Sequence, residues 1–308
     1  MNILNHTIHT KFETPVVFFI FKRPEQTVRV FQAIADVKPS HLYIIADGPR
    51  NLGEALLCQQ TRQIVEKVDW ECEVRKNYSD ANLGLRNRII SGLDWVFGQE
   101  KRAIILEDDC LPDMTFFRFC DELLEYYKDD EDVMHISGDC FLDGKWKITG
   151  SYYYSKYAHV WGWATWREAW LLFHKWETDQ TRLNLDLRIF QTQSERVFWS
   201  NLLEQFRSNS MDYTWDYQWA LICMTQKALC VMPKSNLVSN IGFGPDSSHT
   251  IDVSVVANIP TTAIEFPLVH PPSLSWDIEA DEQVSKLFFR MPNLFHRIIK
   301  HIQHIISN

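Results

Sequence analysis

Ile104-Ile105-Leu106-Glu107-Asp108-Asp109 is an apolar run that ends in three consecutive carboxylates. The apolar part is typical of a buried parallel strand. In an α/β sheet, ligands bind just beyond the carboxyl ends of the strands, and a hard divalent cation prefers oxygen ligands. Because three adjacent negative charges repel one another, we expect a cation at this strand end. The alternative is an acidic triplet that merely opens a solvated loop.

Short apolar runs alternate with amphipathic stretches on both sides of this triplet. The runs predict strands at 16–21, 42–46, 72–75, 103–106 and 133–137, and the stretches between them predict helices at 25–35, 54–68, 85–97 and 114–128. Pro24 suits a first helical turn, and Asp113 is a plausible N-cap. Strand-helix alternation indicates an α/β fold with a largely parallel sheet. Beyond residue 137 the alternation fades into an aromatic segment, a polar helical region and a loop-rich stretch at 233–272.

The composition excludes several classes of protein. The chain has 308 residues and a formal net charge of −9, which argues against non-specific binding to nucleic acid. Seven cysteines without a Cys-x-x-Cys pair indicate reduced thiols and a cytoplasmic protein. The first apolar run is too short for a signal sequence or a membrane span. No Gly-x-Gly-x-x-Gly and no P-loop motif is present, so neither an NAD-type site nor a P-loop site is predicted.

Several motifs together carry a resemblance to a known family. The triplet, followed by Leu111-Pro112-Asp113 and Phe116-Phe117, resembles the Glu-Asp-Asp form of the DxD motif of GT-A glycosyltransferases, and is especially similar to the N-acetylglucosaminyltransferase I group. Trp215-Asp216-Tyr217-Gln218-Trp219 resembles the Trp-Asp-Asp-Trp element of that group but departs from it at Tyr217. Asn82-Leu83-Gly84 belongs to the same resemblance. The segment Trp161-Gly162-Trp163-Ala164-Thr165-Trp166 is similar to one in related bacterial transferases.

The resemblance implies a GT-A fold, a Rossmann-like mixed and mainly parallel sheet flanked by helices. It implies one domain over residues 1–272, with a nucleotide-binding half at about 15–137 and an acceptor half at about 138–272. The donor is expected to be a nucleotide-sugar of the UDP type, bound with Mn²⁺ or Mg²⁺. Asp109 is then the metal ligand, Glu107 faces the ribose, and Asp108 acts through the metal's water shell. Sites of this type use few protein ligands.

Nucleotide contacts are expected at the ends of the first two strands and at the start of the third helix. Arg23 follows the first strand, and Asp47 follows the second, where a carboxylate could accept from the uracil or the ribose. An Asp-Gly pair is otherwise a simple turn. Gly84 lies in the Asn-Leu-Gly element, and Arg86 could reach the diphosphate or remain a solvated first-turn arginine.

An inverting transferase needs one general base for the acceptor hydroxyl, and Asp216 is the candidate. The alternative for Asp216 is an acid on a helix face beside two core tryptophans. Trp161, Trp163 and Trp215 are candidates for stacking on the acceptor, with a packed aromatic core as the alternative. His249, in a glycine-containing polar loop, is a further candidate ligand for metal or phosphate.

The tail, residues 273–308, contains an amphipathic pattern at 294–306 with basic residues on one face. Docking on the cytoplasmic face of an anionic membrane and packing on protein are both open. The sequence thus favours a metal-dependent inverting glycosyltransferase that acts on a glycan or lipid-linked acceptor in surface polysaccharide synthesis. The alternatives are a sugar-nucleotide pyrophosphorylase, which should carry a glycine- and Arg/Lys-rich loop after the first strand, and a non-catalytic glycan-binding protein derived from a transferase.

Overall fold

The computed structural model describes residues 11–142, 146–178, 184–208, 214–243 and 256–289. Its strands are β1 (Val16–Ile20), β2 (His41–Ala46), β3 (Glu73–Tyr78), β4 (Arg102–Glu107), β5 (Cys110–Pro112), β6 (Val133–Ser137), β7 (Tyr152–Ser155), β8 (Trp163–Trp166), β9 (Leu229–Pro233) and β10 (Val238–Asn240). Its helices are α1 (Pro24–Val37), α2 (Leu52–Ile64), α3 (Leu85–Phe97), α4 (Met114–Tyr126), α5 (Arg167–Thr178), α6 (Gln193–Arg207), α7 (Asp216–Thr225) and α8 (Ile278–Phe288).

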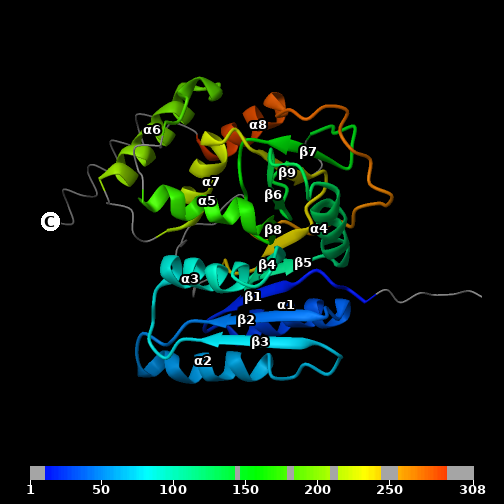
Figure 1. The fold of residues 1–308 in the computed structure, drawn as a ribbon, viewed down its shortest axis with the longest axis vertical. Helices are drawn as coiled ribbons and strands as arrows, with labels where there is room; N and C mark the ends of the chain where they lie inside the picture. The colour runs from blue at the N-terminus through cyan, green and yellow to red at the C-terminus, as the bar shows by residue number, and fades with distance from the viewer. Residues whose placement is uncertain (1–10, 143–145, 179–183, 209–213, 244–255, 290–308) are drawn as a thin grey trace, which may run out of the picture.

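One eight-stranded sheet organises the molecule, in the order β3-β2-β1-β4-β8-β6-β9-β7, and runs from the bottom to the top of Figure 1. The first four strands are parallel, as are β6 and β9, whereas β8 and β7 are antiparallel to their neighbours. Strands β1 to β4, β6 and β9 therefore end at one common edge. The predicted α/β class, with a mixed and mainly parallel sheet flanked by helices, is confirmed.

Local sequence explains where the elements begin and which faces they bury. Every residue of β1 is buried, and its side chains alternate between two core clusters on opposite faces of the sheet. Pro24 stands in the first turn of α1, and the Asp113 side chain accepts from the Thr115 backbone N–H at the start of α4, as predicted. Helix α4 buries three phenylalanines and thereby fixes the chain just after the acidic triplet.

The second half of the chain contributes to the same sheet instead of forming a separate layer. β8 lies between β4 and β6, where it is hydrogen-bonded to both. Trp163 was a candidate for stacking on the acceptor, with a packed aromatic core as the alternative, and Trp163–Trp166 is a fully buried strand. Strands from both predicted halves thus alternate across one core.

Helix α8 lies beyond residue 272, in the part of the chain that was expected to be a tail. Ala280 and Val284 belong to the core, and Asp281 is 1 % exposed and bonded to Ser155 and Lys156. Residues up to 289 therefore pack on the main body. The amphipathic pattern at 294–306 lies outside the described residues. Among the helices described, none combines the length and the apolar character that crossing a membrane requires.

Candidate functional site

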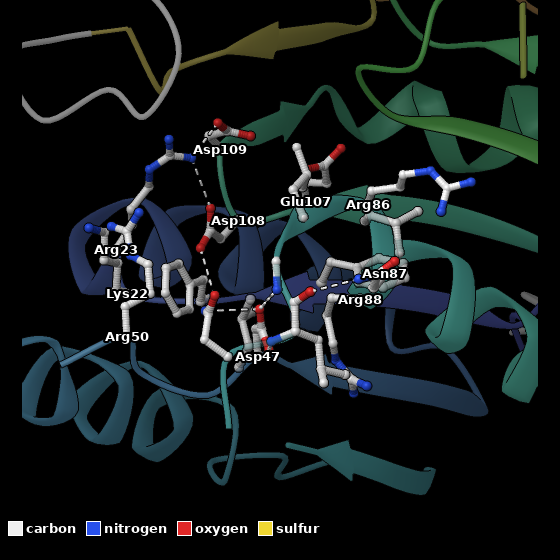
Figure 2. A pocket seen from close by; sticks show the side chains of 18 residues that line it. Lys22, Arg23, Asp47, Arg50, Arg86, Asn87, Arg88, Glu107, Asp108 and Asp109 are labelled. Carbon is white, nitrogen blue, oxygen red and sulfur yellow. Dashed lines mark hydrogen bonds and ion pairs between the residues drawn. The ribbon is translucent and has the colours of Figure 1, made fainter. Parts of the chain in front are cut away.

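The carboxyl ends of β1, β2 and β4, together with the start of α3, enclose a cavity of about 390 Å³ (Figure 2). The acidic triplet forms one wall and the first turn of α3 another. All six residues predicted to bind the nucleotide line this cavity, namely Arg23, Asp47, Gly84, Arg86, Glu107 and Asp108, and so does the predicted metal ligand Asp109. The structure thus brings together residues that are up to 86 positions apart, since Arg23 contacts Asp109 directly.

The triplet carries more negative charge than its surroundings balance. Arg23 Nη1 lies 3.3 Å from Asp108 Oδ1 and 2.5 Å from Asp109 Oδ2, and the Phe21 backbone N–H donates to Asp108 at 3.0 Å. Burial and the charge of Asp109 nevertheless raise the pKa of Asp108 to about 7. Burial and the charges of Asp109 and Asp108 also raise the pKa of Glu107 well above its usual value. One arginine does not offset three carboxylates, and the site is suited to a further cation.

Gly242 packs directly against Asp109. The Ile241 backbone N–H donates to the Asp109 carbonyl at 2.8 Å, which extends the pairing of β10 with β5. A Cβ on residue 242 would lie 2.2 Å from Asp109 Oδ2 and 2.8 Å from its Cβ, so only glycine fits. The sequence analysis noted here only a glycine-containing polar loop around His249. It could not find the contact, because strand pairing brings together residues more than 130 positions apart.

Asp47 has a different role from the one expected. Its Oδ1 accepts from the Gly48 and Leu83 backbone N–H groups, each at 2.9 Å, and its Oδ2 accepts from Asn82 Nδ2 at 3.0 Å and from the Gly84 N–H at 3.1 Å. A carboxylate offers about four acceptor positions, and these bonds occupy them. Asp47 therefore holds the loop of residues 82–84, just before α3, through hydrogen bonds. This geometry does not support a contact between Asp47 and a base or a ribose.

Arg86 also points elsewhere. Its Nη2 donates to Gln218 Oε1 at 3.0 Å, and Figure 2 shows the side chain extending away from Asp108 and Asp109. The contact joins the first turn of α3 to α7, the helix that begins with Asp216. Arg86 also lines the cavity, and its expected contact with the diphosphate stays a prediction.

Two further cations lie at the mouth of the cavity on the α2 side. Lys22 Nζ is 2.6 Å from Glu54 Oε1, and Arg50 forms a second ion pair with the same carboxylate. The hydrogen bond from Arg50 is the main reason that the pKa of Glu54 falls to about 2. Lys22 and Arg50 thus line the cavity while paired with Glu54, and the sequence analysis did not identify Arg50 as a site residue.

Asp216 is partly exposed at the first position of α7, where Thr214 Oγ1 donates to its carboxylate. Its charge is among those that raise the pKa of Glu107, which puts the two acids within electrostatic reach of each other. Asp216 is not among the residues that line the cavity, and its neighbour Trp215 is buried.

The three candidate tryptophans have different environments. Trp163 is 1 % exposed and Trp215 is 3 % exposed, and their rings stack with centroids 5.6 Å apart. These two indoles are core residues in this structure, which favours the alternative of a packed aromatic core over contact with a sugar. Trp161 is only partly buried and meets Phe243 edge-on at 5.6 Å. Of the three, Trp161 has the surface that a ligand could reach.

A metal ion fits this donor set only if the protein supplies few of its ligands. Within the described residues, no group of three or more His, Cys, Asp or Glu side chains has the arrangement of a metal site by itself. His249, the other predicted ligand, lies outside the described residues. Asp109, with Asp108 and Glu107 beside it, is the part of the chain that suits Mn²⁺ or Mg²⁺, since such ions retain water and substrate oxygens.

Comparisons with protein-family models and with curated proteins find no match. Solved structures with some similarity include UDP-glucose pyrophosphorylase (TM-score 0.36, 10 % identity, 73 % of this chain and 93 % of that chain) and 4-diphosphocytidyl-2C-methyl-D-erythritol synthase from Anaerococcus prevotii (0.33, 10 %, 65 % and 85 %). A third is the bifunctional glycosyltransferase WbbM (0.32, 10 %, 74 % and 39 %). Because these TM-scores and sequence identities are low, the function of this chain has to be argued from the site.

Proposed function

We propose that this protein is a metal-dependent inverting glycosyltransferase that moves a sugar from a UDP-type donor to a glycan or lipid-linked acceptor. The observation that carries the proposal is the uncompensated acidic triplet at the carboxyl end of β4, on the wall of a cavity large enough for a nucleotide. The chemistry that Mn²⁺ or Mg²⁺ supplies when bound is neutralisation of the negative charge on the leaving nucleoside diphosphate.

The residues of the chain take distinct parts in this scheme. Asp109 holds the cation, with Gly242 as its close neighbour, and Asp47 fixes the loop that forms the opposite wall. Asp216 accepts the proton of the acceptor hydroxyl, a role that typically contributes about 10²- to 10⁴-fold in rate. Since one base drives one displacement, the product has inverted anomeric configuration.

The metal-binding step is tested by calorimetric titration of UDP in Mn²⁺ and in EDTA. We expect tight binding only with Mn²⁺, and loss of at least about 10-fold in affinity for both Asp109→Ala and Gly242→Ala. Gly53→Ala is the matched control, because a Cβ there has only the Asn51 side chain nearby, at 3.2 Å. Equal UDP affinity in Mn²⁺ and EDTA would remove the metal from the proposal.

The transfer step is tested by turnover with UDP-sugars and isolated surface glycans or lipid-linked acceptors. Asp216→Asn should keep UDP affinity and slow transfer by about 10²-fold or more, because an amide cannot take the proton. Unchanged turnover, or a product of retained configuration, would exclude Asp216 as the base.

A sugar-nucleotide pyrophosphorylase is the second candidate, because Lys22, Arg23 and Arg50 place positive charge at the cavity where pyrophosphate would bind. It predicts release of UTP when the protein is given UDP-glucose and pyrophosphate. Release of UTP without any transfer to an acceptor would favour this second function over the first.

A further inference from the structure

Asp139 and His159 form an acid-imidazole pair at the same edge of the sheet as the acidic triplet. Asp139 comes two residues after β6, and His159 comes four residues before β8. Since β6 runs in the same direction as β4, with β8 between them, the pair lies about 10 Å from the end of β4 by strand spacing. The sequence analysis singled out neither residue.

The two side chains of the pair lie close together and are largely buried. Asp139 is 1 % exposed, its Oδ1 lies 3.2 Å from His159 Nδ1, and its Oδ2 accepts from the Trp161 N–H at 3.3 Å. Asp139 Oδ1 and His159 Nδ1 are both buried, and neither has a hydrogen bond of good geometry within the described part of the chain. Burying such groups is costly when they serve packing alone. With Nδ1 turned to Asp139, Nε2 is the nitrogen that can meet a ligand.

A row of aromatic rings connects this pair with the triplet. The Phe141 ring lies 4.5 Å from the His159 ring, 5.0 Å from that of Phe288 and 5.2 Å from that of Trp161. Phe288 is 43 % exposed, so the row reaches the surface. At its other end Trp161 meets Phe243, whose neighbour Gly242 abuts Asp109.

Flat apolar rings beside one polar pair match the chemistry of a sugar, whose C–H faces stack on aromatic rings while its hydroxyls form hydrogen bonds. A buried carboxylate in the same place disfavours an anionic group. We propose that His159 and its aromatic neighbours bind the acceptor as a neutral pyranose, with Nε2 bonded to a ring hydroxyl and Asp139 as a positioning residue that fixes the imidazole. This inference rests on the proposed function for the identity of the sugar as acceptor.

Saturation-transfer NMR on the full chain with Mg²⁺ and UDP tests the proposal. The probes are the methyl glycosides of glucose, galactose, mannose and N-acetylglucosamine, with methyl glucuronide as an anionic comparison. We expect at least one neutral glycoside to bind, and His159→Ala to weaken it at least about 10-fold while UDP affinity is unchanged. The control His174→Ala removes another histidine paired with an aspartate, Asp94, and should leave binding intact.

Two more variants separate binding from folding. Phe288→Ala changes a partly exposed side chain at the end of α8 and should weaken the glycoside several-fold in a folded protein. Asp139→Asn should weaken it too and should change the ring-nitrogen NMR shifts of His159, which a packing role would not move. Three results would overturn the proposal. They are preferential binding of the glucuronide, unaltered glycoside binding in His159→Ala, and no glycoside binding by a protein that binds UDP. Glycoside binding through His159 without UDP binding would support this site and refute the glycosyltransferase.

Discussion

Asp47 and Asp109 each lie just after a strand of the parallel sheet, yet their partners give them different roles. Asp47 accepts four hydrogen bonds from the chain itself, whereas Asp109 faces one arginine and two further carboxylates. The number of donors around each acid therefore distinguishes a structural carboxylate from one that is suited to bind a cation.

We predict that Asp47→Asn lowers the free energy of unfolding by about 1–3 kcal/mol, because the amide group turns a donor toward donors of the 82–84 loop. UDP affinity should fall with it, while the relative affinity for UDP and GDP stays the same. Urea unfolding and nucleotide titration measure the two effects, and exposed Asp69→Asn is the control. A change in nucleotide preference at unchanged stability would restore Asp47 as a base-reading residue.

His135 is a second residue whose surroundings fix its charge state. It is fully buried, Trp219 Nε1 donates to its Nδ1 at 3.1 Å, and its Nε2 lies 2.7 Å from the His159 carbonyl. A proton on Nδ1 would therefore point at the indole N–H of Trp219, so that two hydrogen-bond donors would face each other. Burial lowers the pKa of His135 from 6.5 to about 3, and the ring is neutral in the folded protein.

The pKa shift of His135 predicts a loss of stability in acid. Between pH 6.5 and 3 the unfolded chain binds a proton at this histidine and the folded chain does not, so stability falls as pH falls through that window. At pH 4.5 the contribution is about 3 kcal/mol. His135→Gln keeps an acceptor and a donor but cannot titrate. The difference in unfolding free energy between the wild-type protein and this variant should therefore change by about 3 kcal/mol from pH 7.5 to pH 4.5. A difference independent of pH would refute the assignment.

At the scale of elements, one buried ion cluster joins β7, α6 and α8. Lys156 Nζ lies 3.3 Å from Glu195 Oε1 and 3.8 Å from Asp281 Oδ2, and all three side chains are nearly inaccessible. Glu195 also completes a capping box with Thr192 at the start of α6. The cluster explains why α8 packs on the body although a Pro-Pro pair precedes it.

Removal of the single cation from this cluster should be severe. We predict that Lys156→Met lowers the free energy of unfolding by about 3–5 kcal/mol, because two buried carboxylates lose their shared partner. Lys286→Met is the matched control, since the Lys286–Glu282 pair is about half exposed and should contribute no more than about 1 kcal/mol. Chemical denaturation measures both. Similar losses for the two variants would show that the cluster does not hold α8 in place.

At the scale of the whole molecule, local patterns predicted what depends on local structure. Apolar periodicity predicted the strands and helices of residues 15–137 except the short strand β5, and Pro24 and Asp113 predicted the starts of α1 and α4. The insertion of β8 between β4 and β6 depends on pairing across about 60 residues, so no window of sequence reports it. The close contact of Gly242 with Asp109, and the hydrogen bonds from the 82–84 loop to Asp47, also join residues that are far apart in the sequence. Residue types therefore predicted which residues line one cavity, but not which partners these residues have there.

The shared sheet makes a prediction for the molecule as a unit. Because β8 bonds to both β4 and β6, the parts before and after residue 137 should unfold together, and calorimetry should show one transition with equal calorimetric and van't Hoff enthalpies. Hydrogen exchange should give β2 and β9 the same opening free energy, although they lie on opposite sides of β8. A fragment of residues 1–137 loses β8 from the edge of β4 and leaves Ile104 and Ile105 without their strand partners Ala164 and Trp163, so it should lack cooperative unfolding. Two separate transitions, or a fragment with native-like circular dichroism and a cooperative melt, would show that residues 15–137, the predicted nucleotide-binding half, form a domain of their own.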